Sequence, residues 1–208
     1  MKSVWEQTGE HRDFAPLKGD ISIDVLIIGG GMAGILCAYL LHGAGVPYVL
    51  TEAETVCGGI TKNTTAKITI QHGLIYDKLL RRFGIGRAGQ YLCAQKAALQ
   101  KYRELCSGMD CDFEEKDAYV YALEEQRKLE QELSAMERLG FHGDFVEHLP
   151  LPFPVAGAVR VHNQAQFHPL KFVCCLAKGL HIYEHTPVRE LIGTTAVTDS
   201  GKVAAKAV

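Results

Sequence analysis

Residues 24–54, DVLIIGGGMAGILCAYLLHGAGVPYVLTEAE, constrain the fold more than any other part of the chain. They begin with a short, apolar, β-branched segment of the kind that is buried in a parallel sheet. A helix rich in small residues follows and ends at Gly43 and Gly45, and PYVLTE then forms a second strand. Two parallel strands joined by a helix make a βαβ unit, so the sequence predicts an α/β fold.

The junction between the first strand and the helix has the spacing G-x-G-x-x-G, with Gly29, Gly31 and Gly34 at the glycine positions. The first glycine permits a tight turn, the second lets the backbone approach a pyrophosphate, and the third allows helix and strand to pack closely. The helix start offers N–H groups and a partial positive charge to phosphates. The pattern alone is weak, but here it follows a strand and opens a helix. We therefore predict a dinucleotide-binding turn that includes Met32 and Ala33.

An acidic residue ends the second predicted strand. Glu52 lies 18 residues after Gly34, where a carboxylate can accept hydrogen bonds from a ribose diol. The same carboxylate would repel a 2′-phosphate, which disfavours an NADP-type ligand. Ala53, the next residue, is predicted to belong to the same site. The motif does not decide between FAD and NAD, because both ligands contain ADP.

A polar loop, TVCGGITKNTTAK, occupies residues 55–67 and is called the Thr-rich loop below. The polar segment that begins here is too long for a simple connection, which favours a binding role. Its small and hydroxyl-bearing residues, Gly59 among them, suit the ribityl chain and edge of a flavin. The glycine motif also lies close to the N-terminus, as in many flavoproteins. Both features favour FAD, and an NAD-binding domain stays open as an alternative.

Composition excludes several classes of function. The 208 residues suffice for one core or two small lobes, and 47% are apolar. The net charge is -2 with Lys and Arg scattered, so no nucleic-acid partner is expected.

No apolar run in the sequence suits a bilayer span and the start lacks a signal-peptide core, so we expect no membrane association and a cytoplasmic location. The seven cysteines include no C-x-x-C pair and are interpreted as reduced thiols, and the nine dispersed histidines predict no metal site.

The remaining elements are predicted from periodicity and turn residues. Residues 75–83 and 87–107 form two helices, the second with Tyr91, Ala98, Tyr102 and Leu105 facing a core. The other predictions are two short strands in 111–123, an amphipathic helix in 124–141, a Pro-rich crossing between lobes at 149–161, a helix in 168–180 and an antiparallel β-meander in 182–208. The expected domains are an N-terminal arm (1–20), a discontinuous FAD-binding domain (21–110 and 165–208) and a partial substrate or cap lobe (111–164).

The chain resembles a family of FAD-dependent oxidoreductases, the D-amino-acid oxidase, glycine oxidase and sarcosine oxidase group. The resemblance is carried by residues 24–54, by VCGGITKNTTAKIT directly after them, and by FHPLKFVCCLAKGLHIYEHTPVRELI. It implies a Rossmann-like, glutathione-reductase-type FAD-binding domain, with a parallel sheet plus a β-meander, and part of an α+β substrate lobe. It also points to a bacterial branch whose members often carry a C-terminal Rieske domain.

The resemblance implies a role for individual residues. Gly29, Gly31, Gly34 and Glu52 would bind the ADP part of FAD. Three hydroxyl-bearing residues of the Thr-rich loop would lie on the flavin side: Thr61, Thr64 and Thr65. Val188 would give backbone contacts to adenine. The implied reaction is hydride transfer from a C–H next to nitrogen, in a small amine or amino acid, to the flavin.

The sequence also departs from the family. Relatives run to roughly twice this length, whereas this chain stops at Val208, inside an expected strand, and lacks paired Cys-His motifs of a Rieske centre. We expect weakened FAD affinity and a homodimer or partner chain that covers the truncated sheet edge. The alternative function is a catalytically incomplete dinucleotide-binding module that needs a partner chain.

No catalytic residue is predicted. Lys67 and His72 follow the threonines of the loop and are candidates to tune a flavin, but a surface or structural role is favoured for both. Tyr119 and Tyr121 belong to the expected substrate lobe, where core packing is favoured over substrate contact. Arg160 is not a convincing carboxylate-binding arginine.

Overall fold

The computed structural model describes residues 2–9 and 12–208 and divides into two compact units. The first unit consists of Met1–Thr65, Met109–Cys111 and His168–Val208, and the second of Ala66–Gly108 and Asp112–Phe167. Our sequence-based boundaries had assigned residues 66–110 to the FAD-binding domain. The structure groups residues 66–108 with the second unit, because the long helix in this stretch packs against the other helix of that unit.

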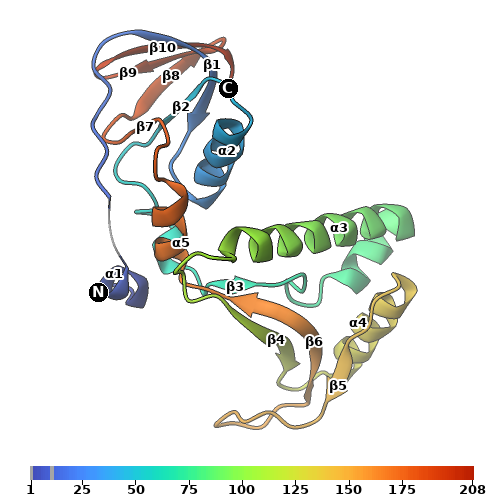
Figure 1. Ribbon diagram of the computed structural model, residues 1–208. Helices are drawn as coiled ribbons and strands as arrows, with labels where there is room; N and C mark the ends of the chain where they lie inside the picture. The colour runs from blue at the N-terminus through green and yellow to red at the C-terminus, as the bar shows by residue number, and fades with distance from the viewer. Residues whose placement is uncertain (1, 10–11) are drawn as a thin grey trace. The chain divides into compact units, whose positions relative to one another are not determined.

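A six-stranded sheet forms the centre of the first unit (Figure 1). Its strands, in the spatial order β7-β2-β1-β10-β9-β8, are Ile182–Tyr183, Tyr48–Thr51, Ile21–Ile28, Gly201–Ala207, Thr195–Thr198 and Val188–Ile192. β1 pairs in parallel with both β2 and β10, and β2 pairs in parallel with β7. β10, β9 and β8 form an antiparallel meander. The predicted fold class, a parallel sheet with a β-meander, is confirmed.

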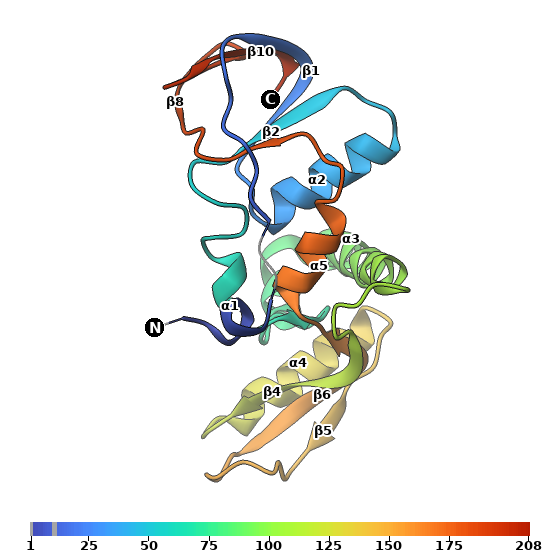
Figure 2. The same cartoon turned by 60° about the vertical axis from the view of Figure 1, so that its left-hand side comes forward.

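The described residues of the first unit form four helical segments: α1 (Val4–Thr8), α2 (Met32–Gly43), the 3₁₀ turn η1 (Thr61–Asn63) and α5 (Pro169–Leu176). α2 packs against β1, β2 and α5, and α1 lies beside α5 (Figure 2). The helix predicted near residue 168 is confirmed, with His168 as N-cap and Pro169 in the first turn. The predicted N-terminal arm contains α1, which begins with a capping box between Ser3 and Glu6.

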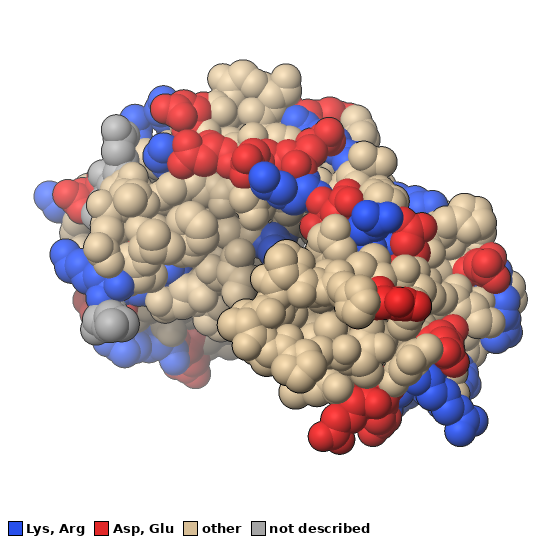
Figure 3. All heavy atoms as spheres, turned by 90° about the horizontal axis from the view of Figure 1, so that it is seen from below, with Lys and Arg blue, Asp and Glu red and all other residues tan. Residues whose placement is uncertain are grey.

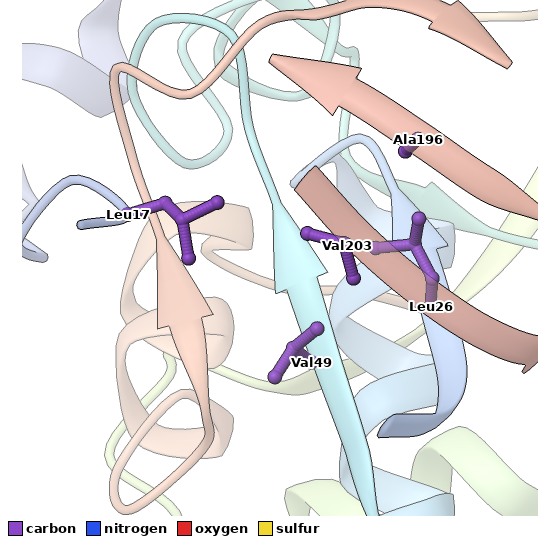
Figure 4. Close-up of a cluster of buried hydrophobic side chains, with 5 residues drawn as sticks. All are labelled: Leu17, Leu26, Val49, Ala196 and Val203. Carbon is purple, nitrogen blue, oxygen red and sulfur yellow. The ribbon is translucent and has the colours of Figure 1, made fainter. Parts of the chain in front are cut away.

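The arm also contributes to the core of the first unit. Leu17 from the arm packs with Leu26, Val49, Ala196 and Val203, each almost fully buried (Figure 4). These side chains come from four strands of the sheet and from the arm itself. Burial of each large side chain in such a cluster stabilises the fold by about 1.5–3 kcal/mol. The segment before β1 is therefore an integral part of this unit.

The second unit pairs a four-stranded sheet with two helices. Its strands are β3 (Lys67–Ile68), β4 (Glu114–Ala122), β5 (Asp144–Val146) and β6 (Gly157–Gln166). β6 is central and pairs antiparallel with the other three. α3 (Tyr76–Cys106) packs against α4 (Gln126–Arg138), and α4 lies along the sheet (Figures 1 and 2).

α3 unites the two helices predicted at 75–83 and 87–107. Gly84 has a φ of 73°, outside the helical region, and marks the kink between the two parts. The predicted core-facing stripe is partly wrong: Ala98 is exposed, and the buried side chains in this part are Ala88, Leu92, Leu99 and Cys106. The apolar face therefore follows Leu92 and Leu99, seven residues apart. Tyr91 and Tyr102 lie at its margin, half-buried, with ring contacts to Tyr76 and Phe167.

Two further predictions in this unit are wrong. Residues 111–123 contain one strand, β4, rather than two. The pairing of β4 with β6 has a register shift between Lys116 and Ala118, which interrupts the alternation along the strand. The Pro-rich stretch before residue 157 does not cross between lobes. It leads into β6, which pairs with β4 from Gly157 to Gln166 within the same unit.

The start of α3 is capped by a buried carboxylate from α4. Ile75, the N-cap residue, makes no side-chain hydrogen bond to the helix. Instead the Glu132 carboxylate accepts hydrogen bonds from the backbone N–H groups of Tyr76 and Asp77, each at 2.9 Å. Glu132 is fully buried, and this burial raises the pKa of its carboxyl group. The contact joins the two helices through groups that water does not reach.

The helices and the charged surface can be compared with what a membrane span requires and with the composition of the chain. None of the helices in residues 2–9 and 12–208 combines the length and the apolar character of a bilayer-spanning segment. Acidic and basic side chains both occur on the face drawn in Figure 3. This mixture agrees with the 22 basic and 24 acidic residues of the sequence.

The cysteines differ in exposure, which predicts their reactivity. Cys37 and Cys93 are exposed, and Cys57 is buried with its pKa raised to about 11 by burial. We expect iodoacetamide at pH 8 to alkylate Cys37 and Cys93 first and Cys57 only after unfolding. Peptide mass mapping after short exposure checks this order. Early modification of Cys57 would contradict the structure around the Thr-rich loop.

Candidate functional site

The turn between β1 and α2 depends on its glycines, and residues Gly29 to Gly34 are called the glycine turn below. Gly29 has a φ of 103°, and its N–H donates to the carbonyl of Thr51 at 2.8 Å. A Cβ on Gly34 would lie 2.0 Å from the Gly29 carbonyl oxygen, so only glycine fits there. A Cβ on Gly31 would meet nothing nearer than Thr61 Oγ1, at 3.9 Å. Gly34 therefore permits the close packing of α2 against the turn, whereas the absence of a side chain at Gly31 leaves the surface beside the helix start open.

The start of α2 presents backbone donors at this open surface. The first intrahelical bond runs from the N–H of Ile35 to the carbonyl of Gly31, at 3.0 Å. Helix geometry leaves the preceding N–H groups of Met32, Ala33 and Gly34 without an acceptor inside the helix. The Met32 N–H donates to Thr61 Oγ1 at 3.2 Å, so the Thr-rich loop reaches the helix start. Such a set of donors is suited to an anion such as a pyrophosphate.

The Glu52 carboxylate is held directly beside the glycine turn. One oxygen accepts the Gly30 N–H at 2.6 Å, and the other accepts the Glu54 N–H at 3.0 Å. A Cβ on Gly30 would lie 3.1 Å from Glu52 Cβ, so this glycine permits the close approach. Glu52 is partly exposed and Ala53 is exposed. The structure thus brings together the two sequence features that defined the predicted site.

The Thr-rich loop folds back onto the glycine turn at one point and onto the arm at another. The N–H of Cys57 donates to the Gly30 carbonyl at 2.9 Å, with Cys57 in the left-handed region at a φ of 56°. At the other end, Trp5 Nε1 donates to the carbonyl of Thr64 at 2.8 Å. Thr65 and Gly59 are exposed. Of the three predicted threonines, Thr61 is therefore the one that reaches the helix start by a hydrogen bond.

A buried carboxylate that the sequence analysis missed fixes this loop. Glu184 is 1% exposed, and its oxygens accept the N–H groups of Val56 at 2.6 Å and Phe14 at 2.9 Å. Thr186 donates its N–H to the Glu52 carbonyl at 2.8 Å and accepts the Leu17 N–H on Oγ1 at 3.0 Å. The sequence signal that could have identified Glu184 is its position directly after the apolar strand β7 (Ile182–Tyr183). This segment ties the arm and the Thr-rich loop to the sheet.

Val188, the predicted adenine contact, begins β8 and lies two residues after Thr186. Its side chain is partly buried against the core cluster of the first unit. All the residues of the predicted cofactor site thus belong to one unit. Among the described residues, no group of three His, Cys, Asp or Glu side chains is arranged to hold a metal.

The aromatic candidates of the second unit are not core residues, which corrects that prediction. Tyr119 is 41% and Tyr121 45% exposed, and the half-buried Val120 lies between them in β4. Arg160, opposite Tyr119 in the β4–β6 pairing, forms a salt bridge with Asp144 at 2.6 Å. Lys67 and His72 are exposed. None of these residues shares a unit with the glycine turn.

Comparison with known families gives a match over most of the chain. The FAD dependent oxidoreductase family matches residues 24–208, from within β1 to the last residue. The chain belongs to this family. FAD is the cofactor of the family, and the glycine turn, the acidic residue after β2 and the β-meander lie within the matched residues. The arm, residues 1–20, lies outside the match.

Two curated relatives extend the comparison. The Bacillus subtilis (strain 168) protein YhfW, which carries the name of a Rieske 2Fe-2S iron-sulfur protein, is 38% identical over 194 residues. That match covers 89% of this chain and 38% of the relative. Gamma-glutamylputrescine oxidoreductase of Escherichia coli (strain K12) is 23% identical over 95% of this chain and 50% of the relative. The chain thus spans half or less of the length of these proteins.

A solved structure supports the fold. Glycine oxidase from Bacillus cereus ATCC 14579 superimposes with a TM-score of 0.64 at 21% identity, over 88% of this chain and 53% of the oxidase. At this level of identity the likeness establishes the shared fold and not the substrate. The predicted relation to the glycine oxidase group is confirmed by this structure together with the family match.

Proposed function

We propose that the first unit binds the ADP part of FAD across the glycine turn and meets the flavin side with the Thr-rich loop. The observation that carries this proposal is the set of backbone donors at the start of α2, open beside Gly31 and flanked by the Glu52 carboxylate. The residues we assign to the site are Gly29, Gly31, Met32, Ala33, Gly34, Glu52, Ala53, Gly59, Thr61, Thr64, Thr65 and Val188.

Each group of residues has a separate task in this proposal. The Ala33 N–H would bind a pyrophosphate oxygen in the positive field of the helix start, beside the Met32 N–H that donates to Thr61 Oγ1. Glu52 would accept hydrogen bonds from the ribose diol, since its position is already fixed by the Gly30 N–H. Thr61 would then orient the ribityl side, next to the helix donors that it already contacts.

For the complete protein we propose oxidation of an amine or amino acid at the C–H next to nitrogen. The family match and the names of the relatives, an oxidoreductase of gamma-glutamylputrescine and a glycine oxidase, support this substrate class. FAD, when bound, supplies the acceptor for the hydride. The described residues of this chain would bind and orient the cofactor, and we assign none of them a catalytic role.

Anaerobic addition of substrate tests the reaction. The protein is loaded with FAD and mixed without oxygen with glycine, proline or putrescine in turn. We expect at least one of these amines to bleach the visible flavin band, with the colour returning on admission of air. A flavin band that survives all three amines, while FAD stays bound, would favour a dinucleotide-binding module without this activity.

Replacement of Glu52 tests the assignment of the ribose site. Glu52→Gln removes the charge but keeps the shape, and loss of hydrogen bonds to a charged acceptor weakens binding by roughly tenfold. We expect the Kd for FAD to rise by about this factor. Glu54→Gln, two residues on and exposed, is the matched control and should leave the Kd unchanged. Fluorescence titration of flavin measures both, and equal effects would contradict the assignment.

A second proposal concerns partners and location. β8 is an edge strand of the six-stranded sheet, and its Leu191 and Ile192 side chains are 48% and 60% exposed. This supports the proposal that a second copy or a partner chain covers the edge. Sedimentation equilibrium tests this proposal, and a monomer at high concentration would exclude the homodimer.

We also propose a cytoplasmic location, which the free state of all seven cysteines supports.

A further inference from the structure

A separate cavity of about 280 Å³ lies in the first unit between α1, the Thr-rich loop and α5 (Figure 2 shows these elements). Within the described residues, its lining includes neither the glycine turn nor Glu52 or Thr61. Its volume is close to the lower limit of about 300 Å³ for small-molecule sites. Part of its wall comes from the arm, which lies outside the family match. The cavity is therefore distinct from the proposed FAD site.

Buried polar contacts fix two walls of this cavity. The Glu184 carboxylate holds Phe14 of the arm and Val56 of the loop by their N–H groups, and both residues line the cavity. Since Glu184 is buried and bonded to both segments, the distance between these walls is set by the fold. The cavity is thus part of the fold and not a gap between mobile side chains.

A second buried group, His168, holds α1 against α5. Its Nδ1 accepts the Lys171 N–H at 3.2 Å, and its Nε2 lies 3.0 Å from Thr8 Oγ1. Because Nδ1 accepts, Nε2 carries the proton and donates to Thr8, whose hydroxyl donates to the Val4 carbonyl. The Trp5 ring packs edge-on against the imidazole, at 5.0 Å between centroids. The third wall is therefore fixed as well.

The charges of the lining favour an anion. Lys62 pairs with Glu6 at 3.0 Å, and this pair is neutral. Lys2 and Arg12 also line the cavity, and neither forms an ion pair with another described residue. Two cations in one cavity lining, with no counter-ion among the described residues, attract a carboxylate or similar anion.

The α5 side of the cavity is apolar. Leu170, Val173 and Ala177 line it on successive turns of the helix, and Val173 and Ala177 are buried. Apolar surface opposite cationic groups suits a ligand with a hydrocarbon body and an anionic end. We propose that this cavity binds a small aliphatic carboxylate, with its hydrocarbon chain on α5 and its carboxylate between Lys2 and Arg12.

Hexanoate is the probe for the test, and Trp5, the only tryptophan of the chain, is the reporter. Trp5 lies in α1 next to the lining residue Glu6. We expect hexanoate to change the Trp5 fluorescence with a saturable, salt-sensitive dependence, and hexylamine to produce no saturable change. Inorganic phosphate, which has the charge without the chain, should bind at least tenfold more weakly. Hexylamine binding as tightly as hexanoate would overturn the proposal.

Variants separate this cavity from the FAD site. Lys2→Gln together with Arg12→Gln, both exposed, should weaken hexanoate at least tenfold without affecting the fold. Arg189→Gln, an exposed arginine already paired with Asp199, is the matched control and should change nothing. Gly31→Ala changes the proposed FAD site and not the lining of the cavity, so this variant should retain hexanoate binding. Unchanged hexanoate affinity in the double variant, or its loss in Gly31→Ala, would overturn the assignment.

Discussion

Gly34→Ala is expected to abolish FAD binding by disrupting the fold of the glycine turn. Its new methyl group would lie 2.0 Å from the carbonyl oxygen of Gly29, a backbone atom that cannot rotate away. Overpacking of this kind costs about 1–3 kcal/mol or more, so α2 must shift away from β1. We expect a lower midpoint of thermal unfolding together with the loss of FAD binding, measured by circular dichroism and flavin fluorescence.

Gly31→Ala is the matched control for this prediction. Gly31 has a φ of -74°, which alanine adopts without strain, and its new methyl group meets no atom nearer than 3.9 Å. The methyl group would instead occupy the surface where we place the pyrophosphate. We expect this variant to unfold at the wild-type temperature and still lose FAD affinity. Equal destabilisation of both variants would contradict the division of roles between the two glycines.

Glu132→Ala is expected to produce the largest loss of stability in the second unit. The change leaves the N–H groups of Tyr76 and Asp77 without their acceptor in a buried place. An unsatisfied buried group costs about 1–3 kcal/mol, so the free energy of unfolding should fall by roughly 3 kcal/mol. Urea titration followed by circular dichroism measures this loss. Glu130→Ala, exposed on the same helix, should change stability by less than about 0.5 kcal/mol.

The same residue predicts a dependence of stability on pH. Burial raises the pKa of Glu132 in the fold above its ordinary value of 4.5. At a pH between the ordinary pKa and the raised pKa, the folded chain holds a proton on Glu132 that the unfolded chain has lost. The contribution of Glu132 to the free energy of unfolding therefore decreases as the pH rises. We expect Glu132→Gln, which cannot titrate, to remove this slope. An identical pH profile for the variant and the wild type would show that the pKa is not raised.

Much of the first unit was predictable because its signals are local. The glycine spacing, the apolar strand before it and the acidic residue after β2 are read within 31 residues, and the structure brings them into contact. The meander was marked by turns at Gly193 and Gly201. These features depend on backbone conformation, which the local sequence specifies strongly.

The predictions that were wrong concern contacts between distant segments. β4 was divided because a register shift interrupts its alternation, and β6 was missed because its partner lies about 40 residues earlier in the chain. Glu184 and Glu132 were not singled out, since a buried carboxylate is indistinguishable from a surface one in sequence. Their partners, Val56 and Tyr76, are 128 and 56 residues away.

The central claim, that the glycine turn binds the ADP part of FAD, is tested most directly by comparing FAD with FMN. FMN contains the flavin and the ribityl phosphate but lacks the AMP part, and with it the complete pyrophosphate and the ribose diol of the adenosine. In equilibrium dialysis with the purified chain, we predict saturable binding of FAD, competition by ADP and at least tenfold weaker binding of FMN. FMN binding as tight as that of FAD, or FAD binding that ADP does not reduce, would contradict the account.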